Sequence, residues 1–127
     1  MRRRGVETVI LAGADTQGIM RGKRLPIAEL TRAAEHGVAL CEVMWALPID
    51  GREPVQRPPG PAGYFPRDGY PDMLSMPDLE TARIVPWHDR TALLLCDFVD
   101  RDGSAVPVSP RAAAVTDWET DRYLEAL

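Results

Sequence analysis

The sequence has 127 residues, of which 45% are hydrophobic and 27% charged, as in an ordinary globular domain with a buried core. Fifteen basic residues stand against nineteen acidic ones, and the net charge of −4 offers no cationic field for a phosphate backbone or an anionic lipid surface. Residues 1–5, with Arg2-Arg3-Arg4, are expected to be a solvated tail, so neither nucleic acid nor a membrane is an expected partner.

Two cysteines, Cys41 and Cys96, stand apart from each other in apolar surroundings. The sequence shows neither a signal peptide nor a long apolar segment, so we expect reduced, buried thiols in a cytoplasmic protein. His36 and His88 would complete a set of four zinc ligands, but neither pair has the close spacing typical of zinc sites. No metal site is therefore expected.

The first third of the chain predicts a hairpin followed by a helix. Residues 6–14 are β-branched and apolar, 15–18 form a turn signal, and 19–25 can return as a second strand. Pro26 is suited to the first position of a helix, and apolar residues then recur at helical spacing until Gly37. We predict an amphipathic helix over residues 26–36.

The rest of the chain predicts further strands separated by a long loop. Residues 38–49 are apolar, contain Trp45 and favour a strand or an irregular segment, and the proline-rich tract 52–68 predicts a loop. A strand is expected at 78–87, and the apolar run 91–99 predicts a central strand buried on both faces. A turn at 100–103 leads to a short strand at 104–108.

The last residues predict a short helix, because Thr116 and Glu119 have the spacing of a capping box. Together these elements predict an α+β fold: a β-grasp-like mixed sheet of four to six strands with one packed helix, plus a short C-terminal helix. We expect the domain to span residues 6–111 and an extension to span 112–127.

A series of short motifs resembles the amino-terminal β-grasp domain of glutamine synthetases. Each motif alone is weak, but their order and spacing across residues 6–111 are specific. They are Asp15-x-x-Gly18-x-x-Arg21-Gly22-Lys23, Gly69-Tyr-Pro-Asp72-Met, Pro77-Asp78-Leu-x-Thr81-x-Arg83-x-x-Pro86-Trp87, Leu95-Cys96-Asp97 and Pro110-Arg111.

The resemblance implies a role in ligation. In that family the small domain packs against the catalytic domain of a neighbouring subunit, and its carboxylates help bind ammonium or an amine that attacks an ATP-activated glutamate. Carried over by position, Asp50 and Asp72 are the candidates. After Asp50-Gly51 the proline-rich tract replaces the family's serine-containing stretch, which implies a different loop shape and leaves room for an amine larger than ammonia.

Structural interpretations compete with functional ones at the other motif positions. Asp15 and Gly18 are expected to shape the first turn. Arg21 and Lys23 are expected to be solvated, or to form salt bridges with a partner subunit. Asp78 is expected to begin a turn, and Trp87 to be a core or interface aromatic.

The sequence carries no phosphate-binding glycine loop, metal-ligand cluster or activated nucleophile, and only sixteen residues follow Arg111. We therefore expect no cofactor in this chain; ATP and Mg²⁺ or Mn²⁺ are implied for a catalytic domain that it lacks. Three hypotheses follow: a regulatory or assembly module, a half-site supplied in trans to a glutamine synthetase-type catalytic domain or like subunits, and a free-standing β-grasp binding module.

Overall fold

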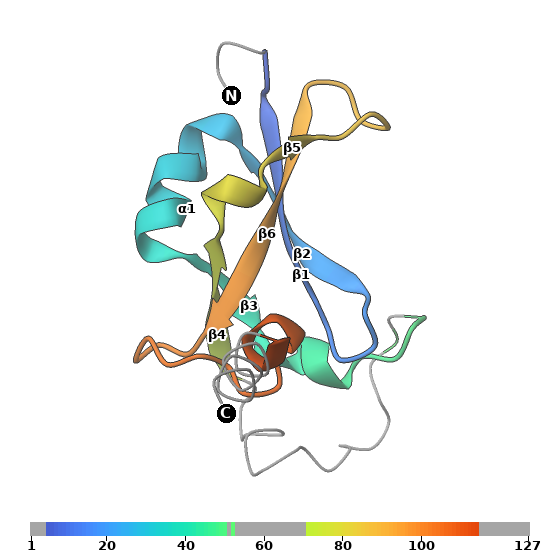
Figure 1. Cartoon of the computed structure of the whole chain (residues 1–127), viewed down its shortest axis with the longest axis vertical. Helices are drawn as coiled ribbons and strands as arrows, with labels where there is room; N and C mark the ends of the chain where they lie inside the picture. The colour runs from blue at the N-terminus through green and yellow to red at the C-terminus, as the bar shows by residue number, and fades with distance from the viewer. Residues whose placement is uncertain (1–4, 51, 53–70, 115–127) are drawn as a thin grey trace, which may run out of the picture.

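The computed structural model describes residues 5–50, 52 and 71–114 (Figure 1). A hairpin opens the fold, with β1 (Thr8–Ala14) and β2 (Met20–Pro26) joined by a tight turn. A short 3-10 turn, η2 (Ile27–Glu29), leads into α1 (Leu30–His36), so the predicted helix is confirmed with a 3-10 start. Gly37 ends it, as expected.

The segment after α1 consists of a short strand and then a 3-10 helix. β3 (Val38–Cys41) is followed directly by the 3-10 helix η3 (Glu42–Ala46). Beyond the undescribed residues come β4 (Asp72–Pro77), the 3-10 turn η5 (Leu79–Thr81) and the two-residue β5 (Arg83–Ile84). The predicted strand over 78–87 is therefore present only as the two residues of β5, because Asp78 caps η5 and the longer strand, β4, precedes it.

β6 (Thr91–Val99) lies at the centre of a mixed sheet with the order β2-β1-β6-β4-β3, and β5 also pairs with β6. The β1–β6 pairing is parallel and the others are antiparallel. This confirms the predicted α+β fold and the central position of residues 91–99. Burial on both faces was wrong, because Leu93 and Leu95 are only half-buried and Asp97 is exposed.

The end of the described chain departs from the sequence prediction in two ways. Residues 104–108 form no full strand, only an isolated bridge between Val99 and Ala105. A helix is present over 110–114, with Pro110 at its first position, so helical structure starts before the expected capping box. Thr116 and Glu119 lie outside the described residues, as does the 52–68 tract apart from Arg52.

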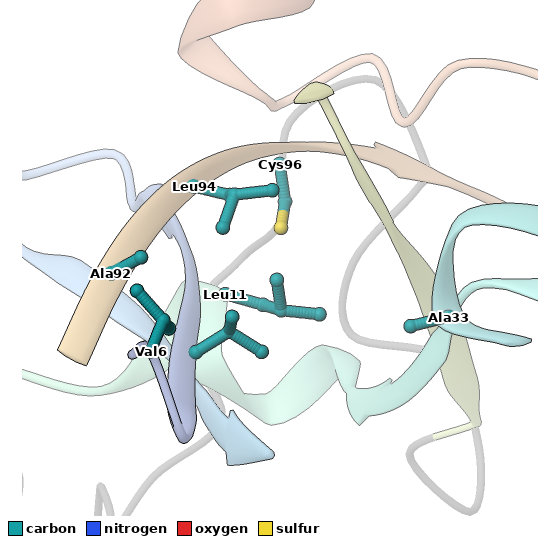
Figure 2. Close-up of a cluster of buried hydrophobic side chains, with 7 residues drawn as sticks. Val6, Leu11, Ala33, Ala92, Leu94 and Cys96 are labelled. Carbon is teal, nitrogen blue, oxygen red and sulfur yellow. The ribbon is translucent and has the colours of Figure 1, made fainter. Parts of the chain in front are cut away.

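The interior has two apolar clusters. The first lies between α1 and one face of the sheet, and Figure 2 shows its side chains converging from β1, β6 and α1; it comprises Val6, Val9, Leu11, Ala33, Ala92, Leu94 and Cys96. The second lies beneath η3 and contains Met44, Trp45, Met73, Phe98 and Val106, with the rings of Trp45 and Phe98 edge to face at 5.4 Å. Together they fix both ends of β6 in the core.

Candidate functional site

Asp72, the better-matched candidate carboxylate, is the first residue of β4. Its backbone lies opposite Cys41 at the end of β3, and the Glu42 amide donates a hydrogen bond of 3.2 Å to the carbonyl of the preceding residue, Pro71. These contacts fix the start of β4 against the start of η3. The Asp72 side chain is half-buried at this end of the sheet.

The Asp72 side chain lines an acidic hollow of about 270 Å³ with Pro71, Asp100, Arg101 and Asp102. Three carboxylates and one guanidinium give this lining a formal charge of −2 at neutral pH. One oxygen of Asp102, Oδ1, already accepts hydrogen bonds from the amide and the hydroxyl of Ser104. A hollow of this charge favours a cation over an anion.

Asp50, the second candidate, is not among the residues that line this hollow. It lies in the turn after η3, and its side chain is 52% exposed. Its carboxylate accepts a hydrogen bond of 3.1 Å from the Arg52 amide and lies 3.3 Å from the Arg52 guanidinium. The two candidates thus lie on the segments that flank residues 53–70, and only Asp72 faces the hollow.

The turn between β1 and β2 is built around the buried carboxylate of Asp15. One oxygen accepts hydrogen bonds from the amides of Gln17 and Ile19, and the other accepts from Nε of Arg21 at 2.6 Å. Gly18 adopts a φ of +79°, which an L side chain disfavours. The turn-shaping role expected of Asp15 and Gly18 is therefore seen directly.

The pKa of Asp15 reflects opposing influences. Burial raises it, but the hydrogen bonds from Arg21 and from the amides of Ile19 and Gln17 outweigh burial, so the pKa lies below its usual value. The carboxylate form of Asp15 is thus the form that the fold stabilises.

Arg21 corrects the expectation that this hairpin side chain is solvated. Its side chain is only 16% exposed, and besides Asp15 it reaches the backbone carbonyls of Leu47 and Pro48. Lys23 on the same strand is exposed, as expected. Gly22, between them, packs so closely on β1 that a Cβ there would collide with the carbonyl oxygen of Leu11.

The later motifs meet in one polar cluster. Arg111 donates from Nη2 to Asp78 at 2.9 Å and from Nε to Asp97 at 2.8 Å. Asp78 caps η5 through the Glu80 amide, and the Thr81 hydroxyl donates to the Asp78 carbonyl while accepting from the Leu95 amide. The hydrogen bond from Arg111 lowers the pKa of Asp78. The expected turn at Asp78 is confirmed, but the sequence did not predict its link to Arg111.

Arg83, Pro86 and Trp87 lie away from the acidic hollow and are exposed. Trp87 is not a core aromatic, because 69% of it is exposed. It borders a second hollow, of about 380 Å³, over the face of the β1–β2 hairpin and β6 that α1 does not cover; Ile10, Met20, Gly22, His88 and Leu93 also line it. Pro77, by contrast, is the last residue of β4 and pairs with Cys96.

The described residues contain no group of three or more His, Cys, Asp or Glu side chains that could hold a metal ion. Cys96 is buried, Cys41 is partly exposed, and the two form no disulfide. Within the same part of the chain, no helix is long and apolar enough to cross a bilayer.

The sequence reasoning missed two features of this site. The contacts of Arg21 with Leu47 and Pro48 involve backbone carbonyls 26 and 27 residues away, which leave no side-chain pattern. The ties between Arg111, Asp78 and Asp97 had a signal, since all three stand in the quoted motifs, but their spacing along the chain does not show that they meet.

Proteins with similar sequences are glutamine synthetases and related glutamate–amine ligases. The chain is 34% identical over 104 residues to type-1 glutamine synthetase 2 of Dictyostelium discoideum, covering 82% of this chain and 19% of that protein. It is 30% identical over 117 residues to the glutamate–isopropylamine ligase of a Pseudomonas species (87% and 24%), and 34% identical over 107 residues to a gamma-glutamylethanolamide synthetase of Streptomyces coelicolor (84% and 22%). The chain spans about a fifth of the length of these relatives.

Solved structures agree on the fold, although no protein-family model matches the chain. A GmaS complex with ADP superposes with a TM-score of 0.67 at 23% identity, over 91% of this chain and 23% of that one. A structure of a novel glutamine synthase homologue gives 0.67 at 25% identity, over 95% and 27%. These relatives and the described fold identify the chain as a glutamine synthetase-like domain, homologous to one region of the glutamine synthetase family.

Proposed function

We propose that this chain acts as the small domain of a glutamate–ammonia or glutamate–amine ligase and supplies carboxylates to the amine site of a neighbouring catalytic domain. The observation that carries the proposal is the position of Asp72. It lines an acidic hollow within a region homologous to ligases whose names specify isopropylamine and ethanolamide chemistry. The negative charge of the residues that line this hollow is the reason to propose a cationic amine as the ligand.

A carboxylate suits the proposed role because ammonia and alkylamines are cations at neutral pH. The anionic oxygens attract the ammonium group and accept its N–H donors. One carboxylate can then take up a proton as the neutral nucleophile forms, and the amine nitrogen attacks the carbonyl carbon of the glutamate acyl phosphate, whose C–O bond breaks to release phosphate. ATP and Mg²⁺ or Mn²⁺ would bind the catalytic domain, so the chain alone is proposed to be inactive.

A second part of the proposal is that this domain assembles with a glutamine synthetase-type catalytic domain or like subunits. The support is the sheet face that α1 leaves uncovered, where Trp87 is 69% exposed and Met20 is 47% exposed beside the second hollow, which Lys23, Arg24 and His88 also line. Exposed apolar side chains with polar side chains around them favour contact with another polypeptide.

A chimera tests the proposed function. This chain would replace the matching region of the Pseudomonas isopropylamine ligase, in which product formation and ATP binding would both be measured. We expect an active enzyme, and we expect Asp72→Asn to lower kcat/KM for the amine by about 100-fold while ATP binding is unchanged. The exposed Asp89 provides the matched control, since Asp89→Asn should leave kcat/KM unaltered.

Two results would contradict the proposal. The first is formation of a γ-glutamyl product by the isolated chain with ATP. The second is a chimera that assembles and binds ATP but forms no product, which would favour the alternative of a binding or regulatory module without ligase chemistry. An active chimera in which Asp72→Asn changes nothing would contradict the role given to Asp72.

A further inference from the structure

The turn of the first hairpin holds a segment that lies far from it in the sequence. Arg21 Nη2 donates to the carbonyl of Pro48 at 3.1 Å and lies 3.4 Å from that of Leu47. The side-chain amide of Gln17 also donates to the Leu47 carbonyl, at 3.2 Å. Two successive carbonyl groups are therefore bound by donors from the turn and from β2 of one hairpin.

Asp15 keeps the guanidinium of Arg21 in place for these contacts. The Asp15 carboxylate is 1% exposed, and the same group accepts the two turn amides and Nε of Arg21. The Nε–H donor of the planar guanidinium binds Asp15, and this contact directs the Nη2 donor toward the two carbonyl groups. The ion pair thus orients a donor as well as closing the turn.

The held segment is otherwise secured by an apolar contact on its other side. The Leu47 side chain packs against the cluster of Met44, Trp45 and Met73, and the Leu47 amide donates to Met44. Ile49 and Asp50 then form a turn, so Asp50 lies two residues after the anchored Pro48. The carboxylate of Asp50 contacts Arg52, and the backbone that carries it continues from the peptide that Arg21 holds.

We infer that the Asp15–Arg21 pair is a positioning device for the turn that carries Asp50, the candidate carboxylate that lies outside the acidic hollow. The inference rests on the proposed function, because it treats Asp50 as a carboxylate that this domain presents to the amine site of a neighbouring catalytic domain. Arg21 and Asp15 do not touch the amine in this scheme; they hold the peptide that carries Asp50. A carboxylate displaced by about 1 Å loses much of its effect on a reacting group, so this anchoring would control amine binding.

The test combines a measurement on the isolated chain with kinetics of the chimera. Arg21→Met removes the donors and keeps a side chain of similar length, and Arg32→Met is the control because Arg32 is exposed on α1, where it pairs with Glu29. We expect lower ¹⁵N order parameters for the amides of Ile49 and Asp50 in Arg21→Met alone. In the chimera we expect KM for the amine to rise about 10- to 100-fold with KM for ATP unchanged.

Arg21→Lys provides a further comparison, because it keeps the positive charge beside Asp15 but lacks the second fork of the guanidinium. We expect an amine KM between those of wild type and Arg21→Met. A merely structural role would lower stability without separating the amine KM from the ATP KM.

The possible failures are distinguishable. An active wild-type chimera whose amine KM is unchanged by Arg21→Met would overturn the positioning role alone. Unchanged order parameters at Ile49 and Asp50 would overturn it as well. An inactive but assembled wild-type chimera would overturn the proposed function, and the positioning role would fail with it.

Discussion

Nη2 of Arg111 lies 2.9 Å from Oδ2 of Asp78, so the start of the last described helix is tied to the turn that follows β4. Nε of the same guanidinium binds Asp97 on β6 at 2.8 Å. Arg111→Ala would leave two neighbouring carboxylates without their shared cation. We expect a lower midpoint of urea unfolding, with Arg32→Ala as the control because the Arg32–Glu29 ion pair is exposed. Equal midpoints for the two variants would contradict a stabilising role for this cluster.

The Asp15 carboxylate should make stability depend on pH. Because its pKa is lowered in the folded state, its contribution to stability is complete above the pKa of the unfolded chain and is lost as pH falls through the folded-state pKa. Asp15→Asn should therefore cost about 1–3 kcal/mol at pH 7. The difference from wild type should shrink as pH falls below about 4.

Urea unfolding of wild type and Asp15→Asn between pH 2.5 and pH 7 measures this difference. Asp50→Asn is the control, since Asp50 is half exposed and contacts only Arg52 among the described residues. A difference between wild type and Asp15→Asn that stayed constant over this range would rule out the proposed linkage.

Gly22 should be intolerant of a side chain because of its close packing on β1. A Cβ at this position would collide with the Leu11 carbonyl oxygen and lie 2.7 Å from Cα of Ala12. Both obstacles are backbone atoms of the neighbouring strand, which cannot move without disturbing the hairpin. We expect Gly22→Ala to lower the free energy of unfolding by about 1–3 kcal/mol, measured by urea titration. Lys23→Ala, at the adjacent exposed position, should be neutral.

The two cysteines should differ in their reaction with iodoacetamide. Burial raises the pKa of Cys96 to about 12, so only about one thiol in 10⁴ is ionised at pH 8. Cys41 is partly exposed. Peptide mass spectrometry after brief alkylation should find Cys41 modified and Cys96 intact in the folded chain. Both should react in 8 M urea, and rapid labelling of Cys96 without denaturant would show that β6 opens readily.

Strong local patterns predicted much of this fold, and long-range pairing explains what they missed. β1 and β6 are apolar runs, the helix has apolar residues at helical spacing, and a turn signal precedes β2; each of these elements is present. β4 was missed because its six residues include Pro77 and two methionines, and its strand form depends on pairing with both β3 and β6. Asp78 then caps a 3-10 turn, so the residues that directly follow it are not in the strand that the sequence predicted.

The candidate site was accessible from the sequence only through the family resemblance. Asp50 and Asp72 have no mutual spacing that indicates amine chemistry, and Asp100 and Asp102 read as a turn before the structure placed them beside Asp72. The anchoring of Leu47 and Pro48 was inaccessible because any residue offers a carbonyl group. The motifs shared with the family thus located the candidate carboxylates, while the contacts that position these residues are visible only in the structure.

Trp87 gives a test that separates stability from assembly. Because 69% of this residue is exposed, we expect Trp87→Ala to change the free energy of unfolding of the isolated chain by less than about 0.5 kcal/mol. If the uncovered sheet face contacts a catalytic domain, the same substitution should weaken assembly of the chimera in sedimentation velocity experiments. Leu79→Ala is the control, since Leu79 is 53% exposed on η5, away from the second hollow. Unchanged assembly would exclude Trp87 from the interface, and a large loss of stability would show that its ring supports the fold itself.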